Sequence, residues 1–66
     1  MKIKFYINWQ QLSAPYNVGI WNADIVKMVD SWNEATLYNK YEDAQKEIES
    51  LPLKGLFTIN KIFIKD

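Results

Sequence analysis

The sequence contains no cysteine and no histidine among its 66 residues. It therefore cannot form a disulfide, and it lacks the usual ligands of a structural zinc site. A chain this short buries only about 60% of the surface that its unfolded form exposes. We expect a single domain over residues 1–66, stabilised by packing alone or by self-association, with no metal ion or other cofactor.

Arginine is also absent, and eight lysines balance eight acidic residues to give zero net charge. Because arginine is the residue that reads guanine and phosphate through paired hydrogen bonds, this composition argues against base-specific DNA recognition. No apolar run approaches the roughly 20 residues that span a bilayer. The first residues alternate in polarity, unlike a signal peptide. A cytoplasmic location is expected.

Aromatic side chains, in contrast, are abundant. Three Trp, four Tyr and three Phe make up 15% of the chain, and 48% of all residues are hydrophobic. A core this small does not accommodate all of them. Some are expected on the surface, which points to a protein partner or a second copy of the chain.

The N-terminal segment predicts the clearest strand. Over residues 2–9, apolar and polar side chains alternate with the period of two that a half-buried strand requires. One face would carry Ile3, Phe5, Ile7 and Trp9, and the other Lys2, Lys4, Tyr6 and Asn8. Residues 10–17 contain Ser, Pro and Asn and predict a loop.

Residues 18–34 allow two interpretations. Ile25, Met28, Val29 and Trp32 have helical spacing, with Asn22 as a possible cap. The β-branched residues of the same segment equally suit a second strand or a hairpin. We favour strand over residues 18–29, followed by one helical turn over residues 30–34.

The segment 39–51 predicts an amphipathic helix. Asn39 can cap it, and Glu42 can complete a capping box. Tyr41, Ala44, Ile48 and Leu51 would form its buried stripe. Pro52 ends the helix and Gly55 supplies a turn.

Two extended segments flank this helix. Thr36 to Tyr38 form a short β-prone bridge before it, and residues 56–65 form a last strand after it. The alternation of the last strand slips at Asn60 and Lys61, which predicts either a bulge or burial on both faces.

Together these elements predict an α+β fold. A small sheet of three to four strands, in β-β-β-α-β order, would have one amphipathic helix packed on one face. The other face of the sheet would remain open.

The segments MVDSWNEATLYNKYEDAQKEIESLP and LFTINKIFIK resemble a type of small uncharacterised protein from phages and prophages. That type has a Val-Asp pair, an Ala-Thr-x-aromatic bridge and a helix that begins with two acids and an alanine. The similarity covers residues 28–64, although Met28 stands where that type more often has Trp. The resemblance implies strand before Asp30 and a phage or prophage origin, and it supplies no catalytic residues.

The sequence contains few residues that could act in catalysis. The nearest paired acids are Asp30 and Glu34, which would share one face of a helical turn and could in principle hold magnesium. The alternative is that Asp30 caps a turn and Glu34 is solvated. Ser13, Ser31 and Ser50 have no histidine to activate them. We therefore expect a protein that is not an enzyme.

Single-stranded nucleic acid is a second possible ligand. If the first and last strands pair, lysines would line one side of the sheet with Tyr6 among them, as in base-stacking platforms. Lysines on outer strands also serve simply to prevent aggregation. The lysines concerned are Lys2, Lys4, Lys61 and Lys65.

Protein binding is the function that the composition favours most. Trp and Tyr bury a large area at low entropic cost, and they anchor many interfaces. Trp9 fits core packing better, and one of Tyr16 and Trp21 is expected to be exposed beside the loop. The partner would be a second copy or a host protein, such as a component of a defence system. The candidate contact residues are Tyr6, Tyr16, Trp21 and Trp32.

Overall fold

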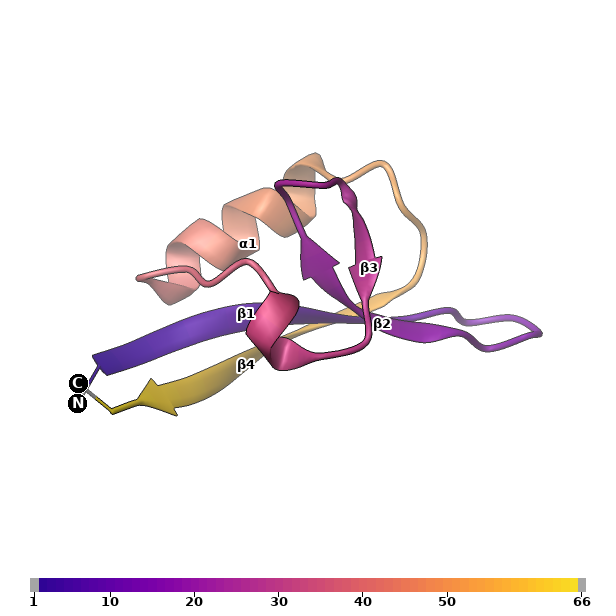
Figure 1. Ribbon diagram of the computed structural model, residues 1–66. Helices are drawn as coiled ribbons and strands as arrows, with labels where there is room; N and C mark the ends of the chain where they lie inside the picture. The colour runs from indigo at the N-terminus through magenta and orange to yellow at the C-terminus, as the bar shows by residue number, and fades with distance from the viewer. Residues whose placement is uncertain (1, 66) are drawn as a thin grey trace.

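The computed structural model describes residues 2–65 as one antiparallel sheet with one helix packed against it (Figure 1). The elements follow the order β-β-β-α-β, which confirms the predicted α+β class. Their bounds are β1 Lys2–Gln10, β2 Val18–Asn22, β3 Lys27–Val29, the 3-10 turn η1 Trp32–Glu34, α1 Tyr41–Ser50 and β4 Leu56–Ile64.

The four strands lie in the order β3-β2-β1-β4, so β1 is central and β4 forms one edge. β1 and β4 pair along their whole length, from Lys2 opposite Ile64 to Gln10 opposite Leu56. β2 pairs only with the last residues of β1. The rest of that side of β1 is occupied by Tyr38, which forms the predicted bridge by exchanging backbone hydrogen bonds with Phe5.

The ambiguous segment 18–34 is a hairpin followed by a helical turn, as we favoured. Asn22 does not cap a helix. Its side-chain oxygen accepts hydrogen bonds from the backbone N–H groups of Asp24 and Ile25, at 2.9 and 3.2 Å. This is the local bonding by which Asn stabilises a turn, and it reverses the chain between β2 and β3.

Helix α1 begins one residue later than the predicted cap requires. Lys40 is the N-cap residue and makes no side-chain capping bond. The prediction that Asn39 caps the helix is wrong, because its side chain instead accepts a hydrogen bond from the Lys4 ammonium on β1. Glu42 and Asp43 still lie in the first turn, where the helix dipole favours acidic residues.

The core is small and lies between α1 and the sheet. Only Ile7, Trp21 and Ala44 are buried among the described residues. Alanine allows the helix backbone to approach the strands closely, and Ile48 and Leu51 extend the same stripe. The other half-buried members of the cluster are Phe5, Ala23, Met28, Tyr38, Phe57 and Ile59.

The register of β4 against β1 is continuous, so the bulge proposed at Asn60 and Lys61 is absent. The slip in polarity has another cause. Phe57 and Ile59 are half-buried on the face that carries α1, whereas Asn60, Ile62 and Ile64 are half-buried on the opposite face. Burial therefore changes face halfway along the strand, in agreement with the second alternative.

Candidate functional site

The sheet face opposite α1 contains a shallow hollow of about 490 Å³, which we call the open-face hollow. Side chains at even-numbered positions of β1, β2 and β4 point to this face, because the paired residues of adjacent strands share a side. Its lining residues are Asn8, Trp9, Gln10, Val18, Gly19, Ile20, Val29, Asp30, Leu56, Thr58 and Asn60.

The open-face hollow is of mixed polarity and carries a single acidic side chain. Val18 and Leu56 are aliphatic and more than half exposed, at 69% and 53%. Asn8 lies opposite Thr58 on the adjacent strand, so an amide and a hydroxyl meet across the strands. Asp30 is the only ionisable residue in the lining. Amides and hydroxyls both donate and accept hydrogen bonds, so this surface suits an uncharged polypeptide more than a phosphate backbone.

The outer edge of β4 is a second unpaired surface. Phe5 directs its backbone N–H and C=O to Tyr38 and therefore away from β4. By the alternation of an antiparallel ladder, the residue opposite Phe5, Lys61, directs its own backbone groups outward. The same holds for every second residue of the strand. The outward-facing residues, which we call the free edge, are Phe57, Ile59, Lys61 and Phe63.

The predicted aromatic contact residues occupy different places. Tyr16 is 61% exposed in the loop between β1 and β2, which projects beyond the sheet (Figure 1). Trp32 is 51% exposed in η1. Tyr6 is half-buried and lies opposite Asn60, at the border of the open-face hollow.

Trp21 is only 4% exposed and belongs to the core. Its indole N–H donates a hydrogen bond to the Glu47 carboxylate at 2.9 Å. A side chain held in this way has no surface to offer a partner. Of the pair that flanks the loop, Tyr16 is thus the exposed member.

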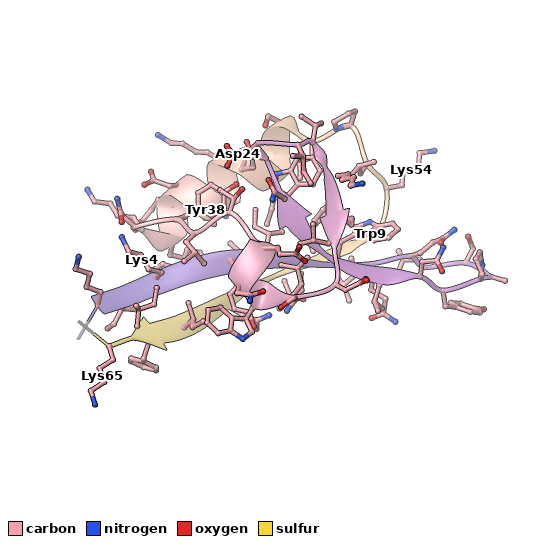
Figure 2. All side chains as sticks on the ribbon, in the orientation of Figure 1. Lys4, Trp9, Asp24, Tyr38, Lys54 and Lys65 are labelled. Atoms are coloured by element: carbon pink, nitrogen blue, oxygen red, sulfur yellow. The ribbon has the colours of Figure 1, made fainter. Side chains whose placement is uncertain are left out.

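The four lysines proposed for nucleic-acid contact do not share a face. Lys2 and Lys4 lie opposite Ile64 and Ile62, on the face of the open-face hollow, while Lys61 lies opposite Phe5 on the face of α1. Figure 2 shows Lys4 and Lys65 pointing away from each other. The expected row of lysines along one side is therefore not formed.

The paired acids Asp30 and Glu34 are both exposed. No group of three or more Asp and Glu side chains within residues 2–65 is placed to hold a metal ion. The strongest electrostatic perturbation lies elsewhere, at Tyr38. Burial raises the pKa of this phenol, and the nearby carboxylates of Glu47 and Asp24 raise it further. Its hydroxyl is buried and has no hydrogen-bond partner of normal geometry within the described chain.

Sequence reasoning predicted that the sheet face opposite the helix would be open, but it did not identify the residues that line the open-face hollow or the free edge. The sequence placed Leu56, Thr58 and Asn60 in the last strand without assigning them to a face. One signal was present in the composition of that strand, since Lys61 is its only charged residue between Leu56 and Ile64. An edge strand normally carries more charge than this.

Comparison of the chain with models of protein families, with curated proteins and with solved structures finds no match in any of the three. Among residues 2–65, no helix has the length and apolar character needed to cross a membrane. Function must therefore be inferred from the arrangement of the residues themselves.

Proposed function

We propose that this chain is a non-catalytic binding protein that acts by contacting another protein. The observation that carries the proposal is the open-face hollow, whose lining combines exposed aliphatic side chains with uncharged amide and hydroxyl groups. Interfaces between proteins commonly combine an apolar centre that lacks charge with neutral hydrogen-bonding groups. Tyr6 at its border, and the exposed Tyr16 and Trp32, would extend the contact at separate points.

The biological setting is part of the same proposal. The resemblance of residues 28–64 to small phage and prophage proteins supports an origin in a phage or prophage. A protein of this size without catalytic groups acts most simply by occupying a surface of a host factor. We therefore propose that it inhibits or redirects such a factor, for example a component of a defence system, in the host cytoplasm.

The single-stranded nucleic-acid alternative has less support. Its lysines are divided between the two faces of the sheet, and the open-face hollow has no basic residue in its lining. A titration with a labelled oligonucleotide at low and high salt tests it. Binding that weakens steeply with salt would favour this alternative, because contacts to phosphates release counterions.

The protein-binding proposal is tested by affinity capture from the native host with a matched pair of variants. Val18 and Val26 are both exposed valines, at 69% and 71%, but only Val18 lines the open-face hollow. The partner captured by the wild-type chain should be lost with Val18→Glu and retained with Val26→Glu. Equal capture by both variants, or no partner with the wild-type chain, would contradict the proposal.

A further inference from the structure

Strand β4 is an unprotected sheet edge. Natural proteins keep such edges short, or protect them with several charges, proline or a bulge, because the unpaired backbone groups otherwise pair with another chain. The opposite edge of this sheet, β3, is only three residues long. β4 has nine residues, one charge, no proline and an unbroken register. No backbone hydrogen bond within residues 2–65 reaches its free edge.

The chain alone also buries little surface. Its accessible area is 4898 Å². A folded monomer of this mass exposes about 4,400 Å² by the usual scaling of area with mass. Part of the excess lies on β4 itself, where Leu56 is 53% exposed on the open face and Phe63 is 60% exposed on the face of α1. A partner along this strand would cover apolar groups on both sides at once.

We propose that the partner is a second copy of the chain, which pairs through β4 in antiparallel orientation about a twofold axis at Asn60. The two four-stranded sheets would then form one continuous sheet. This proposal concerns the free edge and does not depend on the function assigned to the open-face hollow.

The sequence of β4 selects this register. A twofold axis at Asn60 places each residue opposite the residue of the second copy that lies equally far from Asn60 in the other direction along the strand. All nine residues of β4 are then paired. Phe57 then lies opposite Phe63 of the second copy, and Leu56 opposite Ile64. Ile59 lies opposite Lys61, and the free-edge backbone groups of both residues face each other as an antiparallel ladder requires.

Other axes fit less well. An axis at Lys61 would place the two lysines directly opposite each other, which is destabilising in a sheet. An axis at Ile59 would place Phe57 opposite Lys61 and leave Phe63 without a partner on β4. Only the axis at Asn60 separates the charges and pairs the aromatic residues.

This geometry has a consequence for binding. When two sheets join edge to edge in antiparallel orientation about a twofold axis, the corresponding faces of the two copies lie on the same side of the joined sheet. Both α1 helices therefore lie on one face and both open-face hollows on the other. A dimer would therefore present two equivalent hollows in the same direction. Two linked sites gain affinity for a target that is itself repeated or dimeric.

The first test removes one edge hydrogen bond without altering the ladder to β1. The N–H of Lys61 points to the free edge, so Lys61→Pro deletes a donor that only the second copy would use. Lys65→Pro is the matched control, because Lys65 is exposed and lies just outside β4. Sedimentation equilibrium should show a dimer for the wild-type chain and for Lys65→Pro, and a monomer for Lys61→Pro with an unchanged circular dichroism spectrum.

The second test fixes the register and does not depend on the proline variant folding. The chain has no cysteine, so a disulfide formed by a single introduced cysteine shows that the two copies of that one residue lie close together. Across the axis, the two copies of residue 60 form a non-hydrogen-bonded pair with Cβ atoms about 4.5–5.5 Å apart, close to disulfide distance. The two copies of residue 58 are separated by about 14 Å along the strands.

Asn60→Cys should therefore give a disulfide-linked dimer on mild oxidation, while Thr58→Cys should still associate but give no covalent dimer under the same conditions. A wild-type chain that stays monomeric at millimolar concentration would overturn the proposal, whether or not a host protein is captured. A dimer that cross-links through Thr58→Cys, or that fails to cross-link through Asn60→Cys, would overturn the register and with it the proposed interface.

Discussion

The indole N–H of Trp21 donates a hydrogen bond to the carboxylate of Glu47 at 2.9 Å, and this bond ties β2 to α1. The two residues are 26 positions apart in the chain. Helix α1 otherwise contacts mainly β1 and β4. The bond thus fastens the helix to β2, the strand that neighbours β1 on the side away from β4.

Removal of this bond should destabilise the protein. Trp21 is 4% exposed, so Glu47→Ala leaves a nearly buried indole N–H without its acceptor. Hydrogen bonds to charged groups contribute about 1.5–3 kcal/mol, and we expect a loss of that size in urea unfolding. Glu49→Ala is the matched control, since Glu49 is exposed on the same helix and should change stability by less than about 0.5 kcal/mol. Equal effects of the two substitutions would show that the bond does not stabilise the fold.

Tyr38 should make the stability fall at high pH. Burial, with Glu47 and Asp24 nearby, raises its pKa in the folded state above the ordinary value of 10.0. Above pH 10 the unfolded chain releases the phenolic proton while the folded chain still holds it, so folding becomes less favourable as pH rises. One proton gives a slope of at most about 1.4 kcal/mol per pH unit.

The comparison of Tyr38→Phe with Tyr16→Phe isolates this effect from the titration of the lysines and other tyrosines. Urea unfolding between pH 9 and pH 11 should show a weaker decline for Tyr38→Phe than for the wild type. Tyr16 is 61% exposed, so Tyr16→Phe should follow the wild-type curve. A parallel decline in all three proteins would be the contrary result.

Elements with strong local periodicity could be predicted from the sequence. The alternation of residues 2–9 is a property of one segment and was confirmed. The apolar stripe of the helix is also local; it was confirmed at Ala44, Ile48 and Leu51, but the prediction for Tyr41 was wrong, because this side chain is 49% exposed. The cap at Asn39 was wrong for a tertiary reason, because Lys4 on a distant strand binds that side chain. Residues 18–34 could not be decided by periodicity, since the Asn22 turn sets the hairpin and its signal is equally that of a helix cap.

The candidate site was less predictable, because its parts come from several strands. Trp21 and Trp32 are each followed by Asn, yet one is buried and the other exposed. The division of the lysines depends on register. Even-numbered residues of β1 pair with even-numbered residues of β4, which separates Lys4 from Lys61. That register emerges only when the two strands have been placed side by side.

Val26 holds backbone strain that a substitution can relieve. It has a φ of 53° in the turn between β2 and β3, a left-handed conformation that β-branched residues disfavour. The side chain is 71% exposed, so Val26→Gly sacrifices little packing. We expect a gain of about 1 kcal/mol. In a domain of this size that gain corresponds to a rise in Tm of about 4–8 °C.

The neighbouring Ile25 supplies the control for this prediction. It is also exposed, at 54%, and it is not among the residues with positive φ. Ile25→Gly should therefore lower the stability, by about 0.5–1 kcal/mol, because glycine loses more backbone entropy on folding. Differential scanning calorimetry of the two variants should show Tm shifts of opposite sign. A fall in Tm for both would mean that the Val26 backbone is not strained.

Gly55 is required where the chain turns from α1 into β4. Its φ is 146°, and an added Cβ would lie 2.3 Å from the Trp9 indole nitrogen and 2.7 Å from the Gln10 carbonyl oxygen. The same indole N–H donates to the carbonyl of Lys54 at 2.9 Å, so Gly55→Ala must displace the ring and break that bond. We expect Gly55→Ala to cost about 1–3 kcal/mol in urea unfolding. The cost should be smaller in a Trp9→Phe background, which lacks the nearest clashing atom. An equal cost in both backgrounds would assign the requirement for glycine to the backbone conformation and the Gln10 carbonyl, and not to Trp9.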